Sequence, residues 1–356
     1  HLIMRAMQIS RTAPLHERSL EPVEVPIPVP GRGEVRLRVL VCGVCHTELD
    51  EIEGRAIPPH LPVIPGHQVI GRIDAVGEAV EGLSVGDRVG VAWIFHACGQ
   101  CRHCLDGEEN LCAGFRATGR DVNGGYAEKM IVSADFVHAI PEPFGDAEAA
   151  PLLCAGAVGF RALRLTGLLD GEQDGATLGF SGFGASAHLV LQLARQRLPA
   201  CRFYVFARSA DERAFALSLG AEWAGGFDEA PPRLLDAIID TTPAWRPIVS
   251  VLRHLVPGGP LVINAIRKED TDKAALLELD YARDLWLEKQ VRTVANVTRE
   301  DVRECLLWAA EADLHPQVEI YDLAEANQAL LDLRSKPVRG AKVLRVASDT
   351  TAPSAI

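Results

Sequence analysis

The first part of the chain alternates polar and apolar residues over short stretches, which is the period-two pattern of half-buried β-strands. The clearest stretch is "EVRLRVLVCGVC" at residues 34–45, and "GRIDAVGEAV", "GDRVGVAWI" and "GYAEKMIVS" repeat it. Gly and Asp residues separate these stretches, as turns between strands require. The pattern predicts a β-rich domain or barrel in the N-terminal part of the chain.

Near residue 155 the pattern changes to strands that alternate with helices. The stretch "GATLGFSGFGASAHLVLQLARQRL" predicts a strand, a Gly-rich turn and a helix, and "RFYVFARS" with "DERAFALSLGA" predicts a second strand and helix. Two more strands, "LLDAIIDTT" and "PLVINAI", flank another helical stretch. This alternation is typical of βαβ units on a parallel sheet. The C-terminal part adds two helical stretches and a strand, "GAKVLRVAS".

Composition narrows the classes of function. The 356 residues, 48% of them hydrophobic, suffice for about two domains with a sizeable core. A formal net charge of -12 without a cluster of basic residues disfavours nucleic-acid binding. No apolar run is long enough to cross a bilayer and no leader pattern opens the chain, so we expect no membrane partner and a cytoplasmic location. The odd number of cysteines, nine, argues against a disulfide framework.

Four of the nine cysteines lie together in "CGQCRHCLDGEENLC". Four thiolates on one compact loop can surround a tetrahedral Zn²⁺ and leave no open position, which is the pattern of a structural site. Such a site would stabilise a lobe that has little core of its own. Disulfides within the stretch are the alternative, disfavoured in a reducing compartment. The predicted structural-zinc ligands are Cys98, Cys101, Cys104 and Cys112.

A Gly-rich turn, "LGFSGFG" at Leu178–Gly184, joins the first strand of the alternating half to its helix. Such a turn presents backbone N–H groups and a helix N-terminus to a pyrophosphate. The fingerprint G-x-G-x-x-G is incomplete, because Ser181 fills the place of the middle glycine. A tight strand-to-helix connection is the simpler alternative, but the repeated βα units favour a dinucleotide site. The predicted cofactor contacts are Gly179, Ser181, Gly182, Phe183 and Gly184.

The end of the second strand bears on the choice between NAD and NADP. Its tip is Ala207, Arg208 and Ser209, with no carboxylate to bind a ribose 2′-hydroxyl. Arg208 and Ser209 could instead receive a 2′-phosphate. Arg208 could also be an ordinary solvated loop residue. The tip therefore favours NADP over NAD.

A second set of metal-binding residue types is dispersed along the chain. Cys45 lies in "VCGVCHTELD", His67 in "PVIPGHQVIGRI" and Cys154 in "APLLCAGAVGF". A catalytic Zn²⁺ takes three protein ligands and keeps one position open, and two cysteines with one histidine are one such set. Taken singly, each has a simpler interpretation: a histidine in a turn is often structural, and a lone cysteine is often a small buried residue.

Together these motifs resemble the zinc-dependent alcohol dehydrogenases of the medium-chain dehydrogenase/reductase superfamily. The resemblance rests on "GVCHTEL", "PGHQVIG", the four-cysteine stretch, "LLCAG" and the alternating half, in the family's order and over essentially the whole chain. It implies an α/β fold with a GroES-like β-barrel catalytic domain and a Rossmann domain, a doubly wound parallel sheet. The implied catalytic domain is 1–155 and 296–356, with a structural-zinc lobe at 95–115, and the implied Rossmann domain is 156–295.

The resemblance also implies roles for individual residues near the dispersed set. Cys45, His67 and Cys154 match the catalytic zinc ligands. Thr47 matches the hydroxyl that bonds the substrate oxygen and passes its proton on. Glu48 matches the carboxylate that supports the liganding histidine and fixes its tautomer.

Other positions match or depart from the family. His46 and Arg339 match positions that contact the cofactor pyrophosphate, and Trp93 stands where the family lines its substrate pocket, although it could equally belong to the barrel core. Gln68 replaces the usual glutamate after the liganding histidine. Asp50 stands where the family often has a proton-relaying histidine; with an ordinary pKa of about 3.9 it would relay poorly, and a solvated loop acid is the simpler interpretation.

The implied activity is hydride transfer between a primary or secondary alcohol, or the matching aldehyde or ketone, and NAD(P). Two zinc ions per chain are implied, one catalytic and one structural, in a homo-oligomer, either a dimer or a tetramer. One alternative is a polyol or sugar dehydrogenase of the same superfamily, although no residues suited to several hydroxyl groups stand out. The other is a non-catalytic zinc- and nucleotide-binding protein, which the retention of all three catalytic ligands with Thr47 disfavours.

Overall fold

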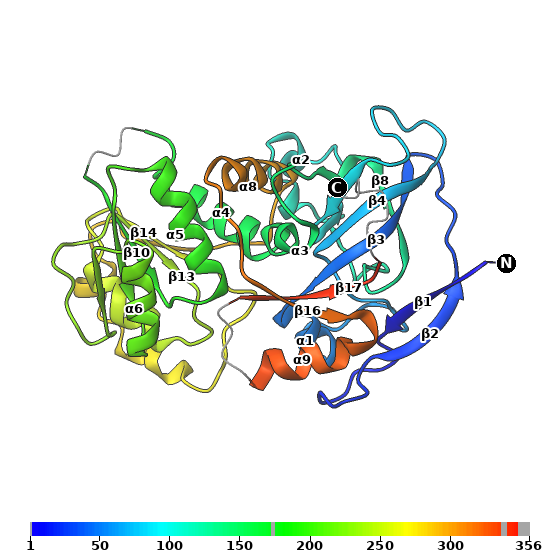
Figure 1. The fold of residues 1–356 in the computed structure, drawn as a ribbon. Coiled ribbons are helices and arrows are strands. Elements are labelled where there is room, and N and C mark those ends of the chain that lie inside the picture. The colour runs from blue at the N-terminus through cyan, green and yellow to red at the C-terminus, as the bar shows by residue number, and fades with distance from the viewer. Residues whose placement is uncertain (1, 172–174, 336–339, 348–356) are drawn as a thin grey trace. The chain divides into compact units, whose positions relative to one another are not determined.

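The structure is a computed structural model that describes residues 2–171, 175–335 and 340–347 (Figure 1). The chain divides into two compact units, His1–Cys154 with Val297–Ile356, and Ala155–Asn296. Among the described helices, none combines the length and the apolar character that a bilayer crossing needs.

The first unit is built around a mainly antiparallel sheet. Its central strand β3 (Glu34–Val44) pairs antiparallel with β4 (Val69–Val76), β8 (Lys129–Ser133) and β17 (Ala341–Arg345). Polar and apolar positions alternate in exposure along the first half of β3, whereas its second half is buried throughout, because neighbours cover it on both sides. The other strands are β1 (Ile3–Gln8), β2 (Glu21–Pro26), β5 (Arg88–Val91), β6 (Ile94–His96), β7 (Arg116–Ala117), β9 (His138–Ala139) and β16 (Val318–Asp322).

Short helices connect these strands. The longest, α8 (Arg299–Glu311), begins where Thr298 and Asp301 form a capping box, which satisfies backbone N–H groups of its first turn. The remaining helices of this unit are α1 (His46–Ile52), α2 (Arg102–Leu105), η1 (Glu109–Leu111), η2 (Ala134–Phe136), α3 (Asp146–Ala149), η3 (Ala150–Leu153), η7 (Leu323–Glu325) and α9 (Ala326–Ser335).

The second unit holds a parallel sheet with the strand order β12-β11-β10-β13-β14-β15. Its strands are β10 (Thr177–Ser181), β11 (Arg202–Phe206), β12 (Trp223–Gly225), β13 (Ala237–Asp240), β14 (Pro260–Ile263) and β15 (Gln290–Thr293). The chain direction across the sheet reverses between β10 and β13, which is the switch point of a doubly wound fold. The predicted α/β class is confirmed, and the wholly buried β10 and β13 explain the continuous apolar runs in the sequence.

Helices flank this sheet. They are α4 (Ala155–Leu165), α5 (Ala185–Arg197), α6 (Ala210–Ser218), α7 (Arg246–Val251), η4 (Leu252–His254), η5 (Lys273–Glu278) and η6 (Tyr281–Leu285). Helices α4 and α5 pack closely at Gly159, where an added Cβ would lie 2.2 Å from Cγ2 of Val190. Only glycine permits that approach, which holds α5 and the turn before it against α4.

A buried histidine should make the first unit sensitive to acid. Burial and then the charge of Arg299 lower the pKa of His138 to about 4, whereas an unfolded histidine titrates near about 6.5. Between about pH 6.5 and pH 4, His138 therefore binds a proton in the unfolded chain but not in the folded chain. The stability of the folded state should fall as the pH drops through this range. Between pH 7 and pH 4.5 this group should cost about 2.5 kcal/mol.

Urea unfolding at both pH values checks this expectation. The variant His138→Gln should lose about 2.5 kcal/mol less than the wild type on acidification, because its side chain does not titrate. Equal losses in the two proteins would show that His138 does not control the acid response.

Candidate functional site

Cys45 lies where strand β3 turns into helix α1. As the N-cap of α1, its Sγ accepts a hydrogen bond from the backbone N–H of Thr47 at 3.4 Å. Glu48 completes the capping box, since its Oε2 accepts from the N–H of Cys45 at 2.8 Å. The cap holds the thiol of Cys45 in one place at the end of a central strand.

His67 follows a Pro-Gly turn that packs tightly. Gly66 has a φ of +103°, and an added Cβ would lie 2.4 Å from Cδ1 of Tyr126, so glycine is required there. The Nδ1 atom of His67 lies 2.7 Å from Oε1 of Glu48, and its Nε2 lies 3.5 Å from Sγ of Cys45. Glu48 thus caps α1 with one oxygen and holds the imidazole with the other, which turns Nε2 toward the thiol.

Cys154 follows η3 and completes the cluster. One donor atom from each of Cys45, His67 and Cys154 lies within 4.8 Å of the other two. Zinc–sulfur bonds of about 2.3 Å and zinc–nitrogen bonds of about 2.0–2.1 Å separate two tetrahedral ligands by about 3.5 Å, which is the separation of Cys45 and His67. Three donors of these types fit a zinc site with one open position.

Burial and neighbouring charges raise the pKa values of Cys45 and His67 in this cluster. A hydrogen bond with Cys154, burial and the charge of Glu48 raise the pKa of Cys45 well above its ordinary value. Burial lowers the pKa of His67, but the charges of Glu48 and Cys45 outweigh it and raise that pKa well above its usual range. A divalent cation that replaces these protons would satisfy two thiolates and a neutral imidazole at once.

The predicted proton-transfer and pocket residues lie beside the cluster. Thr47 is buried in the first turn of α1, directly after the exposed His46. The ring of Trp93 meets that of His67 edge-on, with centroids 4.9 Å apart and planes at 83°. Trp93 is half-buried rather than enclosed in the barrel core, so its ring can line the space next to the metal ligands.

The two departures from the family's sequence lie in different surroundings. Asp50 is buried in α1, and its Oδ1 accepts a hydrogen bond from Nε of Arg55 at 2.6 Å; the interpretation as a solvated loop acid was wrong, because the helix turns this side chain onto Arg55. Gln68 packs over Gly43, where an added Cβ would lie 2.6 Å from its Cδ.

Helix α1 contains a third buried carboxylate, Glu51, beside Glu48 and Asp50, and it was not singled out from the sequence. Glu51 is fully buried, and within the described residues neither of its side-chain oxygens has a hydrogen-bond partner. Burial, followed by the charge of Glu48, raises its pKa well above the ordinary range. In the sequence "HTELDEIEG" an acid at this place looks solvated; the spacing of three residues from Glu48 was the signal that it shares the inward face of the helix.

The four clustered cysteines converge as predicted by their spacing. Their Sγ atoms all lie within 4.8 Å of one another, and those of Cys98 and Cys104 are 3.9 Å apart. A tetrahedron with zinc–sulfur bonds of about 2.3 Å has edges of about 3.8 Å, so the arrangement fits zinc and is too wide for a disulfide. Hydrogen bonds from the backbone of Gln100 and Cys101 lower the pKa of Cys98 to about 6, which favours the thiolate. All nine cysteines are free thiols.

The dinucleotide turn begins later than the sequence analysis placed it. Gly179 and Ser181 lie inside strand β10 and are buried, and an added Cβ at Gly179 would lie 2.8 Å from Leu235. The prediction that they belong to the turn was wrong, because the apolar strand continues to Ser181. Gly182, with a φ of +82°, makes the turn, and Gly184 is the N-cap of α5.

The corrected register restores the fingerprint as G-x-G-x-x-A, from Gly182 to Ala187. An added Cβ at Gly182 would lie 2.8 Å from Cγ2 of Thr242, whereas one at Gly184 would meet no atom within 4 Å. No side chain caps α5, so its first N–H groups remain for an anion. Phe183, between the two glycines, is buried against Phe215. These features fit a dinucleotide.

The tip of β11 carries the residues predicted to distinguish the two cofactors. Ser209 caps α6, with its Oγ accepting from the N–H of Glu212 at 3.1 Å. Arg208 is exposed, and among the described residues its guanidinium has no hydrogen-bond or ion-pair partner. Arg339, predicted to reach the pyrophosphate, lies outside the described residues.

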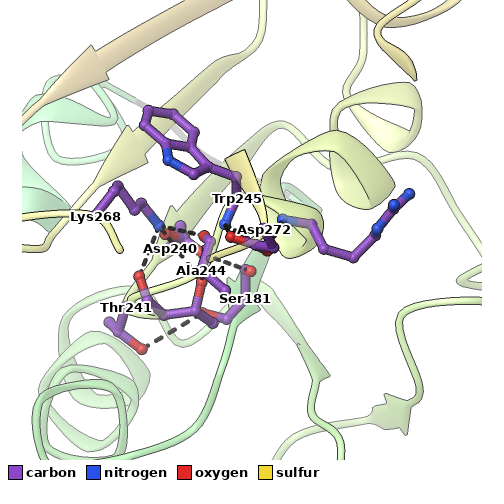
Figure 2. Close-up of polar contacts among 9 residues, drawn as sticks. Ser181, Asp240, Thr241, Ala244, Trp245, Lys268 and Asp272 are labelled. Atoms are coloured by element: carbon purple, nitrogen blue, oxygen red, sulfur yellow. Dashed lines mark hydrogen bonds and ion pairs between the residues drawn. The ribbon is translucent and has the colours of Figure 1, made fainter. Parts of the chain in front are cut away.

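Ser181 ends β10 and Asp240 ends β13; of the polar residues here, Asp240 and Lys268 were not singled out from the sequence. Figure 2 shows Ser181 and Lys268 directed toward Asp240, which is fully buried. Ser181 and Asp240 are register partners on the two strands that flank the switch point. An aspartate at the end of an apolar strand, "AIID", was the available signal.

Comparison with known proteins places this geometry in context. Residues 31–142 match the family described as the alcohol dehydrogenase GroES-like domain, in agreement with the barrel expected from the sequence. The chain is 40% identical over 349 residues to the probable alcohol dehydrogenase AdhA of Mycobacterium tuberculosis, covering 96% of this chain and 97% of that protein.

Two solved structures of alcohol dehydrogenases are also similar to this chain over nearly its whole length. A cinnamyl alcohol dehydrogenase of Sorghum bicolor superimposes with a TM-score of 0.81 at 27% identity, over 97% of this chain and 98% of that one. A cobalt- and zinc-bound thermostable alcohol dehydrogenase of Pyrobaculum aerophilum superimposes with a TM-score of 0.80 at 25% identity, over 97% and 100%.

Proposed function

This chain belongs to the zinc-type alcohol dehydrogenases of the medium-chain dehydrogenase/reductase superfamily, and from that premise we propose that Cys45, His67 and Cys154 hold its catalytic zinc. The enzyme interconverts small alcohols and their carbonyl compounds with a nicotinamide cofactor. The observation that supports the ligand assignment is the convergence of three donor atoms, from three distant segments, within 4.8 Å.

In this proposal the protein positions the reactants and moves one proton. When bound, the zinc would act as a Lewis acid on the substrate oxygen, and the nicotinamide would accept or donate the hydride. The hydroxyl of Thr47 would accept the proton of an alcohol substrate and pass it on. Glu48 keeps Nε2 of His67 directed at the thiols, and Trp93 gives the site an apolar wall, which favours aliphatic and aromatic alcohols.

A structural zinc at Cys98, Cys101, Cys104 and Cys112 completes the proposal, with two zinc ions per chain. The catalytic domain would comprise residues 1–155 and 296–356, and the cofactor domain residues 156–295. A cytoplasmic location, expected from the sequence because no leader pattern or membrane-length apolar run was recognised, belongs to the same proposal.

We further propose that NADP is preferred to NAD, because Arg208 lies two residues after the end of β11, where a carboxylate would favour NAD, and its guanidinium has no partner among the described residues. The variant Arg208→Ala should raise the dissociation constant of NADPH roughly tenfold to hundredfold, since a charged hydrogen bond contributes about 1.5–3 kcal/mol. The dissociation constant of NADH should stay within about twofold. Fluorescence titration with each reduced cofactor measures both, and equal effects on the two would refute the assignment of Arg208.

We also propose a homodimer that forms through strand β15. This strand ends the described sheet, and its four residues are all exposed, with Val291 at 45%. An exposed edge strand offers backbone N–H and C=O groups to a second copy. The variant Val291→Lys should place like charges across such an interface and convert the dimer to a monomer.

Light scattering after size-exclusion chromatography measures the molar mass of the oligomer in solution. The control is Val85→Lys, also at an exposed valine but in the first unit, and it should leave the mass of the oligomer unchanged. An unchanged mass for Val291→Lys would exclude β15 as the interface.

One experiment tests the proposed function as a whole. The purified protein should contain two zinc ions per chain and should change the absorbance at 340 nm with NADP⁺ and short-chain or benzyl alcohol. Sorbitol in the same panel represents the polyol alternative and should be turned over poorly. Absence of hydride transfer with every alcohol and aldehyde would refute the proposal.

A further inference from the structure

A buried ion pair lies at the switch point of the parallel sheet (Figure 2). The Nζ atom of Lys268 donates to Oδ2 of Asp240 at 2.5 Å and to the backbone oxygens of Thr242 and Ala244 at 2.6 and 2.9 Å. The side chains of Lys268 and Asp240 are 7% and 0% exposed. An ammonium group has three N–H donors, and these three acceptors use all of them.

The other oxygen of Asp240 supports the Gly-rich turn. Its Oδ1 accepts from Oγ of Ser181 at 2.7 Å and from Oγ1 of Thr242 at 2.9 Å. The backbone N–H of Thr241 bonds to the oxygen of Ser181 at 2.9 Å. Because an added Cβ at Gly182 would lie 2.8 Å from Thr242, the loop after β13 packs directly on the turn.

Several hydrogen bonds join the loop after β14 to the loop after β13. The N–H of Glu269 donates to the oxygen of Pro243 at 2.8 Å. The carboxylate of Asp272 accepts from the N–H groups of Trp245 and Arg246 at 3.0 and 2.8 Å. Together with Lys268, these bonds make the two loops one rigid support at the carboxyl edge of the sheet.

The charge of Asp240 is unfavourable for a dinucleotide. A diphosphate bound at the Gly182 turn would lie near a buried carboxylate, and in a medium of low polarity the two charges repel over several ångströms. Lys268 cancels this carboxylate. Because its N–H groups are already used, Lys268 acts on the diphosphate through Asp240 and the loop rather than as a direct ligand.

We propose that Lys268 is a positioning residue for the nicotinamide dinucleotide, which acts by neutralising Asp240 beneath the Gly182 turn. The inference rests on the proposed function, because it concerns the same cofactor. The proposal means that Lys268 raises the affinity for the cofactor although it does not contact the phosphates.

Charge-balanced variants test the proposal by fluorescence titration with NADPH and NADH. In Lys268→Met an unpaired carboxylate remains, and the dissociation constants of both cofactors should rise at least tenfold. In the double variant with Asp240→Asn and Lys268→Met the charge is gone, and affinity should return to within about threefold of the wild type. The zinc content and the unfolding midpoint of each variant identify misfolded protein.

A second variant keeps the test decisive if Lys268→Met does not fold. Asp240→Asn removes the carboxylate while Lys268 keeps its charge, so both cofactors should bind at least threefold more tightly; unchanged or weaker binding would overturn the inference. Wild-type affinity in Lys268→Met, or a double variant as weak as the single one, would also overturn it, the latter by showing that Lys268 does not act through the charge of Asp240. A wild-type protein that binds neither cofactor would instead refute the proposed function.

Discussion

The variant Cys154→Ser should lose the catalytic zinc and nearly all alcohol dehydrogenase activity, with kcat/KM falling by roughly 10³-fold or more. The hydroxyl of serine is a poor zinc ligand compared with a thiolate, and only His67 and Cys45 would remain to hold the ion. Metal analysis should show one zinc per chain instead of two, because the four-cysteine site is untouched.

A matched control makes this result specific. Cys305 is, like Cys154, a cysteine of the first unit, but it is fully buried, and its Sγ lies 3.8 Å from the backbone oxygen of Leu152. The variant Cys305→Ser should keep two zinc ions and most of the activity. If Cys154→Ser kept its second zinc, or if Cys305→Ser lost activity equally, the assigned ligand set would be wrong.

The variant Cys112→Ser should destabilise the four-cysteine lobe far more than an ordinary single substitution. Helix α2 in this lobe has no buried residue, and Leu105 and Leu111 are 73% and 42% exposed, so the lobe has little apolar core and the proposed zinc would hold the segment. Structural zinc contributes about 10 kcal/mol or more in small domains. A loss of even a third of this should lower the unfolding temperature by about 10 °C.

Differential scanning fluorimetry and limited proteolysis between residues 99 and 111 measure this effect. The control is Cys201→Ser, a single cysteine of the second unit that is 7% exposed, which should change the unfolding temperature by only a few degrees. Two zinc ions in Cys112→Ser with an unchanged unfolding temperature would contradict the structural role.

The pattern of residues predicted much of the fold and most of the geometry of the metal clusters. Period-two stretches marked β3 and β4, and the strand–helix alternation after Cys154 predicted the parallel sheet. The spacings of Cys98, Cys101, Cys104 and Cys112 predicted one compact cluster, because close spacing in sequence limits how far four thiols can separate. Cys45, His67 and Cys154 were selected from a resemblance and not from spacing, since nothing local brings them together.

Errors arose where a local pattern has two interpretations. The predicted turn, Leu178–Gly184, begins too early because β10 continues to Ser181. Asp50 was interpreted as a solvated loop acid, whereas α1 directs both Asp50 and the neighbouring Glu51 inward. Lys268 and Asp240 were missed, since they lie 28 residues apart and each looks ordinary in its own segment.

The sequence by itself determined the class of fold, the types of metal ligand and the presence of a dinucleotide turn, because hydrophobic periodicity and short spacings are local properties of the chain. Only the tertiary structure decided the register of that turn, the two bonds by which Glu48 joins the α1 cap to His67, and the pairing of Lys268 with Asp240. Each of these joins segments that meet only when strands pair and helices pack, and the free energy of such contacts depends on distances that no single segment specifies.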